Sequence, residues 1–401
     1  MIVVSQSYVC ICQFCLATGG PFSLVDTMLR DCYALLDRQA LQSVVSLMRV
    51  IVTGGAGFIG SAVVRRLVSE NAEVLNIDKL TYAANLWNVA DVERSPNYQF
   101  LSADITDASA IASAFSAFRP TAVIHVAAES HVDRSIDGPA AFLTTNIIGT
   151  FVMLQSALEY VSSRRADEPE FRFVLISTDE VYGSLGASGR FSEESAYAPN
   201  SPYSASKAAA DHLARAWFHT YGLPVLITNC SNNYGPYQHA EKLIPTVIRA
   251  ALAGDAIPVY GAGANVRDWL HVDDHVEGIL AALQRGRPGE KYNFGGDAEV
   301  SNLDLVRLIC ELLDRRVGRP DGKSYAGQIA FVADRPGHDF RYAIDSSKAT
   351  SELSWRRKHT LASGLPLTID WYLEKKDWLL AAPRTGRLGL KPSRNKVRTM
   401  E

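Results

Sequence analysis

The chain has 401 residues, of which 47% are hydrophobic and 21% are charged. This composition supplies enough apolar material for a large core and excludes disorder as the overall state. The 40 lysine and arginine residues nearly balance the 43 aspartate and glutamate residues, which leaves a net charge of -3. That balance predicts no general attraction to nucleic acid or to an anionic membrane surface.

No uninterrupted apolar run reaches the ~20 residues that a membrane-spanning helix needs, so no membrane partner is expected. The apolar start of the chain lacks the lysine or arginine of a signal peptide. The cysteines are Cys10, Cys12, Cys15, Cys32, Cys230 and Cys310. The first three have no second ligand cluster at the usual spacing, so no metal site is predicted. A long body with two cysteines is typical of the reducing cytoplasm.

Residues 1–47 carry no turn-and-strand pattern that would dock them on a sheet. The first strand-like run, Arg49–Thr53, follows Met48 directly. We therefore expect residues 1–47 to be an extension outside the functional fold.

After Met48, short apolar runs alternate with helical sequence. Six runs have the character of strands, namely Arg49–Thr53, Glu73–Asp78, Tyr98–Ser102, Ala122–His125, Phe171–Ser177 and Pro224–Thr228. Between them lies helical sequence such as Ser61–Glu70, Pro139–Val161 and Tyr203–Tyr221. This alternation predicts an α/β fold of Rossmann type, with a doubly wound parallel sheet.

The first strand leads into the glycine pattern Gly54-x-x-Gly57-x-x-Gly60 at the start of a helix. Glycine permits a tight turn and lets a pyrophosphate approach the backbone at the positive helix N-terminus. Asp78 ends the next strand, where a carboxylate can accept hydrogen bonds from both hydroxyls of an adenosine ribose. Since a 2′-phosphate would meet like charge there, NAD is favoured over NADP, and residues 48–235 are predicted to form the NAD-binding domain.

Two further segments follow strands at the edge where open α/β sheets bind ligands. Asp104 and Ile105 come after the third predicted strand. After the fourth come Val126, Ala127, Ala128, Glu129 and Ser130. We expect both segments to contact the cofactor.

The predicted helix Pro139–Val161 is apolar around more than one stripe, which indicates that it buries two faces. One face can pack on the sheet. The other needs a partner, either within this chain or in a second protomer related by a two-fold axis. We expect a homodimer.

Tyr203 and Lys207 are four residues apart, so they share one face of a helix. A tyrosine has an ordinary pKa of about 10, and a nearby ammonium together with the positive ring of bound NAD would favour its phenolate. Thr178, just past the fifth predicted strand, can hydrogen-bond the same substrate hydroxyl. These residues predict oxidation of an alcohol by hydride transfer.

Asp179 and Glu180 follow Thr178 at the mouth of the predicted cleft. Simple alcohol oxidation does not require two adjacent carboxyl groups. Like charge raises the pKa of one group, so that one can act as an acid and the other as a base. Such a pair predicts loss of water next to a newly formed ketone.

Beyond about residue 235 the strand–helix rhythm loosens. Helical sequence at Leu243–Ala253, Val272–Gln284 and Leu303–Arg315 alternates with short strands, so residues 236–375 are predicted to be mainly a substrate-binding lobe. Residues 376–401 end in a basic stretch with proline and glycine, which predicts a flexible tail.

The motifs together resemble the extended short-chain dehydrogenase/reductase superfamily and, within it, the dTDP-glucose 4,6-dehydratase family. The resemblance rests on Thr53–Gly60, Asp78–Tyr82, Ala127–Ile136, Thr145-Asn146, Ser177–Gly183, Tyr203–Lys207, Asn229–Gly235, Glu241–Pro245, Arg267–Trp269 and Asp334–Asp339. It implies that dTDP-glucose is converted to dTDP-4-keto-6-deoxyglucose and water. Tyr203, with Thr178 and Lys207, would remove the C4 hydroxyl proton as NAD takes hydride. Glu180 would remove the C5 proton, Asp179 would protonate the leaving C6 hydroxyl, and hydride would return to C6.

The resemblance also implies binding residues. The implied NAD contacts are Phe58, Ile59, Asp78, Lys79, Leu80, Thr81, Asp104, Ile105, Ala127, Ala128, Ser130, Thr145 and Asn233, beside Gly54, Gly57, Gly60, Val126, Tyr203 and Lys207. The implied substrate contacts are Ser130, Thr178, Asn232, Lys242, Leu243, Pro258, Val259, Tyr260, Arg267, Asn302, Asp334, Arg335, Pro336, Gly337 and His338. Arg267 and Lys242 can neutralise a diphosphate, and Tyr260 can pack against a base.

Two details depart from the family. Ala84 stands where a glycine is usual, and Leu361–Gly364 lacks the usual Phe-Glu pair. Neither removes a catalytic group. The alternatives left open are a dehydratase of UDP- or CDP-glucose, a 4-epimerase, which would not need the Asp179–Glu180 pair, and a non-catalytic NAD-binding regulatory protein.

Overall fold

The structure is a computed structural model that describes residues 48–381. The predicted extension of residues 1–47 lies outside the described residues, as do residues 382–401 of the predicted tail. All structural statements below concern the described part.

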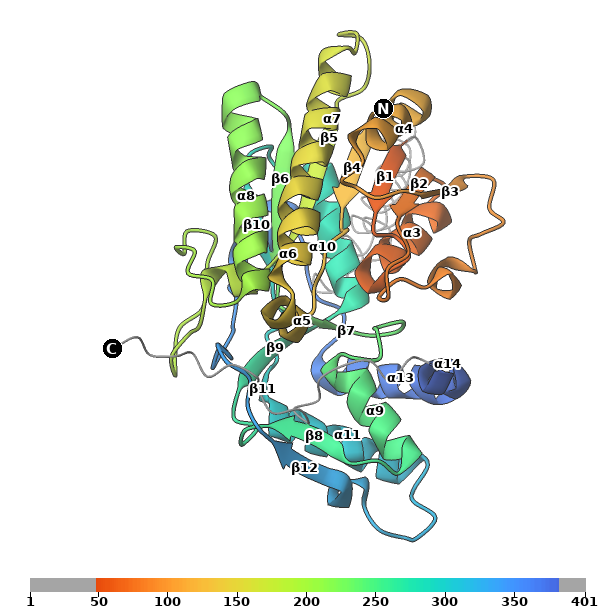
Figure 1. The fold of residues 1–401 in the computed structure, drawn as a ribbon, viewed down its shortest axis with the longest axis vertical. Coiled ribbons are helices and arrows are strands. Elements are labelled where there is room, and N and C mark those ends of the chain that lie inside the picture. Colours follow the sequence, from red (N-terminus) through yellow and green to blue (C-terminus); the bar gives the residue numbers. More distant parts are fainter. Residues whose placement is uncertain (1–47, 382–401) are drawn as a thin grey trace, which may run out of the picture. The chain divides into compact units, whose positions relative to one another are not determined.

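Seven strands form a parallel sheet in the order β10-β6-β5-β4-β1-β2-β3 (Figure 1). Their bounds are Arg49–Thr53 (β1), Glu73–Asp78 (β2), Tyr98–Ser102 (β3), Ala122–His125 (β4), Arg172–Thr178 (β5), Val225–Cys230 (β6) and Lys291–Phe294 (β10). The predicted doubly wound sheet is confirmed. From β1 the order runs in opposite directions through β2 and through β4, and such a switch point is where open α/β sheets bind ligands.

Helices cover both faces of this sheet, which explains why its inner strands are apolar without alternation. Val50, Ile51 and Val52 of β1, for example, are all fully buried. One face carries α4 (Ala108–Phe118), α7 (Thr150–Ser162) and α8 (Pro202–Tyr221). The other carries α3 (Phe58–Ser69) and α10 (Val272–Arg285), which pack on each other as well as on the strands.

The segment Pro139–Ser162 is one helical run of α6 (Pro139–Phe142), a π-helical stretch η2 (Leu143–Gly149) and α7. By length and composition it could span a membrane, but 56% of its apolar window is buried inside this chain, where it packs on α4 and α8. The sequence predicted that this helix buries two faces, but within this chain one of its apolar faces stays partly exposed. Leu143, Ile148 and Phe151 are 48%, 51% and 40% exposed and form an apolar stripe.

A second lobe is formed by elements that follow β6 in the chain. It contains the three-stranded sheet β11-β9-β7 and the parallel pair β12-β8, whose bounds are Asn232–Tyr234 (β7), Ile257–Tyr260 (β8), Val266–His271 (β9), Glu299–Ser301 (β11) and Ile329–Val332 (β12). Its helices are α9 (Leu243–Ala253), α11 (Asn302–Arg316), α13 (Leu361–Glu374) and α14 (Lys376–Ala381). In Figure 1 these elements lie together, and their buried side chains share one apolar core.

The short helical elements are η1 (Leu86–Val89), α5 (Val132–Asp137), η3 (Asp179–Tyr182), η4 (Tyr325–Gln328) and α12 (Ser347–Leu353).

Two features of the fold differ from the predictions made from the sequence. First, α10 and β10, which we placed in the lobe, pack on the main sheet, where β10 pairs with β6. Local sequence cannot reveal this return, because it depends on a pairing between segments far apart in the chain.

Second, the predicted tail does not begin at residue 376. Lys376–Ala381 forms α14, and Leu379 is fully buried in the core of the second lobe. Trp378 packs against that core beside Trp371, with ring centroids 5.5 Å apart. The apolar side chains of this short run therefore hold it on the lobe, although six lysine and arginine residues follow it in the sequence.

Candidate active site

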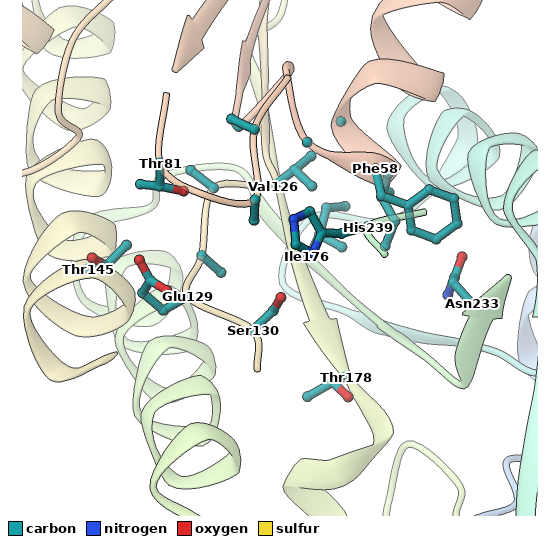
Figure 2. A pocket seen from close by; sticks show the side chains of 18 of the residues that line it. Phe58, Thr81, Val126, Glu129, Ser130, Thr145, Ile176, Thr178, Asn233 and His239 are labelled. Carbon is teal, nitrogen blue, oxygen red and sulfur yellow. The ribbon is translucent and has the colours of Figure 1, made fainter. Parts of the chain in front are cut away.

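A cavity lies along the carboxyl ends of the central strands, and Figure 2 shows side chains that line it. Of the predicted residues, its lining includes Gly54, Gly57, Phe58, Ile59, Gly60, Asp78, Lys79, Thr81, Ile105, Val126, Ala127, Ala128, Ser130, Thr145, Thr178, Asp179, Glu180, Tyr203, Lys207, Asn232, Asn233 and Lys242. The predicted NAD and catalytic residues thus meet in one place, apart from Leu80 and Asp104, which lie outside the lining.

The glycine turn is set by close backbone packing. Gly54 has a φ of +70°, and a Cβ there would lie 2.7 Å from the Cα of Ala127. A Cβ on Gly60 would lie 2.1 Å from the carbonyl oxygen of Gly54. A Cβ on Gly57 would meet only that oxygen, at 3.2 Å, and would otherwise project into free space. Gly54 and Gly60 are therefore required by the fold, whereas Gly57 keeps a cradle open beside the helix N-terminus, where a pyrophosphate fits.

Asp78 ends β2 next to this turn. Its carboxylate accepts hydrogen bonds from the backbone N–H of Ala56 at 3.0 Å and of Leu80 at 2.8 Å. Burial raises the pKa of Asp78, and these two hydrogen bonds oppose the rise. Lys79 reaches Asp104 on the next strand end at 3.2 Å. Asp78 is thus fixed beside the glycine turn, where a ribose is expected. Asp104 does not line the cavity itself, but it pairs with Lys79, which does.

Asn146 holds the loop after β4, a role that the sequence analysis did not assign. Its side-chain oxygen accepts from the N–H of Glu129 at 2.8 Å, and its nitrogen donates to the carbonyl of Glu129 at 3.0 Å and to Ser206 at 2.9 Å. The π-helical stretch places Asn146 inward beside Thr145, which lines the cavity. Such stretches often occur at functional sites.

Tyr203 and Lys207 are both buried on α8 and both line the cavity. Burial raises the pKa of Tyr203 well above its ordinary value, and the negative charge of Glu180 raises it further, while the hydrogen bond with Thr178 lowers it. Lys207 donates to the carbonyl of Ile176 at 2.6 Å. The expected help of Lys207 is therefore not a direct contact with Tyr203 in this structure.

Asp211 stands one helical turn after Lys207 and is another residue that the sequence analysis missed. It is buried and accepts hydrogen bonds from Ser177 and Tyr197, each at 2.8 Å. Its charge raises the pKa of Lys207, against the larger lowering by burial. The spacing of four residues from Lys207 was the signal that could have identified it.

The adjacent acids Asp179 and Glu180 have different surroundings. Burial and the charge of Glu180 raise the pKa of Asp179 well above its ordinary value, and one of its oxygens is buried without a hydrogen-bond partner. Burial also raises the pKa of Glu180, but Arg335, Arg267 and Lys242 oppose that rise. The two acids therefore differ: the pKa of Asp179 is raised well above its ordinary value, whereas three cations oppose the rise at Glu180.

Of the predicted substrate residues of the second lobe, Asn232 and Lys242 line the cavity, and the others lie outside its lining. Arg267 is buried, and its guanidinium donates to the carbonyls of Val266 at 2.8 Å and Asp339 at 2.9 Å. Tyr260 and Arg335 both donate to Asp133, at 2.8 and 2.9 Å. These predicted ligand-binding groups are already held by partners within the chain.

The remaining predicted residues occupy the same lobe. Asp334 and His338 are paired at 2.7 Å. Val259 is 2% exposed and belongs to the core, so its side chain is not available for a ligand. Leu243 begins α9, Asn302 begins α11, Pro258 lies on β8, and Pro336 and Gly337 lie in the loop after β12.

The chain is similar to known proteins over most of its length. The family model described as GDP-mannose 4,6 dehydratase matches residues 51–368. A probable dTDP-glucose 4,6-dehydratase of Sinorhizobium fredii is 56% identical over 332 residues, which cover 82% of this chain and 94% of the relative. The dTDP-glucose 4,6-dehydratase 1 of Escherichia coli K12 is 54% identical over 343 residues, which cover 83% and 94% of the two chains.

A solved structure agrees with these relatives. DesIV, a dTDP-glucose 4,6-dehydratase of Streptomyces venezuelae solved with NAD bound, has a TM-score of 0.76 to this chain at 46% identity. The match covers 82% of this chain and 98% of DesIV.

Proposed function

The chain belongs to the GDP-mannose 4,6-dehydratase family, and we propose that within it the protein is a dTDP-glucose 4,6-dehydratase that uses NAD. The reaction converts dTDP-glucose to dTDP-4-keto-6-deoxyglucose and water. One observation carries the proposal: Thr178, Asp179, Glu180 and Tyr203 line the same cavity as the glycine turn. An epimerase or a non-catalytic NAD-binding protein has no need of that acid pair.

The residues around the glycine turn fit NAD. The cradle at Gly57 leaves room for a pyrophosphate at the start of α3, and Asp78 is fixed where a ribose can bond it. Phe58, Ile59, Ile105, Ala127 and Ala128 supply apolar wall. Bound NAD supplies a hydride acceptor that can later return the hydride. We assign residues 48–235, with α10 and β10, to the domain that holds it.

In the oxidation step Tyr203 takes the proton of the C4 hydroxyl, with Thr178 orienting that hydroxyl. The buried Tyr203 has a pKa that is too high for a base by itself. Lys207 and the positive nicotinamide ring favour its phenolate when NAD is bound. The charge of Asp211 opposes the lowering of the Lys207 pKa by burial.

In the elimination step the two acids take opposite roles. Asp179, whose pKa is raised well above its ordinary value, gives a proton to the leaving C6 hydroxyl. Glu180, whose negative charge Arg335, Arg267 and Lys242 favour, removes the C5 proton that the C4 ketone has made acidic. Of these cations Lys242 lines the cavity, where it can help to neutralise a diphosphate.

The substrate test compares three nucleotides. Purified protein is incubated with dTDP-, UDP- and CDP-glucose, and the alkaline absorbance of a 4-keto-6-deoxy product is followed. We expect product from dTDP-glucose. A signal from UDP- or CDP-glucose alone contradicts the proposed preference for the thymine nucleotide. No signal with any of the three sugars contradicts the proposed activity.

We also propose that the protein is a homodimer in the cytoplasm. The apolar stripe Leu143, Ile148 and Phe151 continues onto α8 through Trp217, whose ring lies 5.8 Å from that of Phe151, and Tyr221, which is 54% exposed. In Figure 1, α7 and α8 lie side by side. A second copy would cover this stripe. Sedimentation of the unchanged chain and of Ile148→Glu tests it: a dimer that the substitution dissociates is expected.

A further inference from the structure

Residues 236–242, called the strap here, connect β7 to α9 and run along the cavity. Gln238, His239, Glu241 and Lys242 line the same cavity as the glycine turn and the loop after β2. Figure 2 shows His239 among the lining side chains. The mechanism above uses only Lys242 of these four residues.

The C-terminal end of the strap is fastened by a buried carboxylate. Only 5% of the Glu241 side chain is exposed, and it accepts a hydrogen bond from Arg134 at 3.3 Å. Glu241 also lies 3.8 Å from Nε2 of His131 and 3.6 Å from Nδ1 of His239. Arg134 and His131 belong to the loop and short helix after β4, so one carboxylate joins the strap to that segment.

The loop after β2 is joined to the same cluster. The guanidinium of Arg134 stacks over the Tyr82 ring at 3.6 Å, and that ring packs edge-on against His239 with centroids 5.7 Å apart. Glu241 and Tyr82 also share a side-chain hydrogen bond. Tyr82 follows directly on Thr81, which lines the cavity. The strap and the loop after β2 therefore meet and close one side of the cavity.

Charge makes Arg134 and Glu241 the central pair of this cluster. Burial and the nearby Lys242 lower the pKa of His131 to about 4, and burial lowers that of His239, so both imidazoles are neutral near pH 7. Lys242 donates instead to the carbonyl of Ser130 at 3.0 Å. Arg134 is thus the cation that contacts Glu241, which itself lies mostly buried.

The N-terminal end of the strap is fastened separately. Tyr237 has a φ of +66°, a left-handed conformation that is rare for an aromatic residue and persists only where its surroundings impose it. Arg65 of α3 stacks over the Tyr237 ring at 4.2 Å, and Trp371 of α13 lies 4.6 Å from it on ring centroids. The hydroxyl of Tyr372 donates to the carbonyl of Gln238 at 2.9 Å.

We infer that the strap is a fastened cover over the NAD site, and that Glu241 is the positioning residue whose contacts with Arg134 and Tyr82 limit the escape of the dinucleotide. The inference rests on the proposed use of NAD. The reaction oxidises C4 and later reduces C6 with the same hydride. If the reduced cofactor left between the two steps, the ketone intermediate could not be reduced and the reaction would stop. A cover that joins three segments across the cavity meets that need.

The test measures cofactor release rather than turnover. Purified protein is loaded with radiolabelled NAD, an excess of unlabelled NAD is added, and the label that remains bound is followed with time. The variants are Glu241→Gln, which keeps the shape and removes the charge, and Tyr82→Leu, which removes the ring. Glu352→Gln is the matched control, because Glu352 also holds an arginine and a tyrosine, Arg287 and Tyr292, but does not line the cavity.

We expect Glu241→Gln and Tyr82→Leu to release label at least about tenfold faster than the unchanged chain, with Glu352→Gln unchanged. Thermal melting of each variant shows that it is folded, and if Glu241→Gln does not fold then Tyr82→Leu decides. Equal release rates in all variants contradict the cover. A chain that retains no NAD even without substitution contradicts the proposed function instead, so the two failures are distinguishable.

Discussion

The cofactor edge of the main sheet and the second lobe differ in how their polar groups are engaged. At the cofactor edge, catalytic groups line the cavity, and one oxygen of Asp179 has no hydrogen-bond partner. In the second lobe, Arg267, Tyr260 and Arg335 are bound by groups of the same chain. The catalytic groups of the first region already line the cavity, whereas these three side chains of the second must exchange or share internal contacts to bind a ligand.

The largest loss of activity is expected when Tyr203, the proposed general base, is replaced. Tyr203→Phe removes the hydroxyl that takes the C4 proton, so kcat should fall by about 10²–10⁴-fold. The assay is product formation from dTDP-glucose with saturating NAD. The matched control is Tyr221→Phe on the same helix, which keeps the ring in the proposed dimer stripe and lies outside the cavity lining, so kcat should stay unchanged. Equal rates for Tyr203→Phe and the unchanged chain would remove Tyr203 from its role.

The next expected effect separates oxidation from elimination. Glu180→Gln keeps the size of the side chain but cannot remove the C5 proton. Turnover should therefore fall by about 10²–10⁴-fold, while the first hydride transfer still occurs. Absorbance of reduced nicotinamide in a single turnover should rise and persist. Full turnover by this variant is the outcome that contradicts the assignment.

The glycine turn predicts a smaller effect of steric origin. A Cβ at residue 60 would lie 2.1 Å from the carbonyl oxygen of Gly54, so Gly60→Ala must displace the turn. We expect a loss of about 1–3 kcal/mol in the free energy of unfolding, together with weaker NAD binding. Gly186→Ala is the control, because its Cβ would meet no atom within 4 Å. Thermal melting and NAD titration give both quantities, and equal melting temperatures for the two variants would contradict the expectation.

Much of the cofactor edge could be predicted from the sequence because its signals are local. The glycine spacing, the acid that ends β2 and the Tyr203–Lys207 pair each lie within one strand, turn or helix. Asn146 and Asp133 could not be identified in this way, since their partners Glu129 and Arg335 lie in other segments. The strand β10 was missed for the same reason: its place is defined by pairing with β6.

The second lobe yields a prediction about the end of the fold. Leu379 of α14 is fully buried, so Leu379→Ala should lower the free energy of unfolding by about 2–4 kcal/mol. Leu380 is 39% exposed, and Leu380→Ala serves as the matched control with a change within about 0.5 kcal/mol. Denaturant unfolding measures both. Equal losses of unfolding free energy for the two variants would indicate that residues 376–381 belong to the flexible tail, as the sequence predicted.

The smallest expected effect concerns pH. The folded-state pKa of Asp179 is raised above the ordinary value of 3.8, so the folded chain binds this proton more tightly than the unfolded chain. Its contribution to stability is therefore present below pH 3.8 and is lost as the pH rises through the folded-state pKa. In Asp179→Asn the side chain does not titrate, so this loss of stability with rising pH is absent. The difference in unfolding free energy between variant and unchanged chain should grow in favour of the variant with rising pH, and a pH-independent difference would contradict the raised pKa.

Isotope transfer tests the central claim most directly, namely that one hydride leaves C4, is held, and returns to C6 after water is lost. dTDP-glucose carrying deuterium at C4 is converted by the protein, and the product is examined by NMR and mass spectrometry. The account predicts that the deuterium appears in the new methyl group at C6. A product whose methyl group carries no deuterium would contradict it.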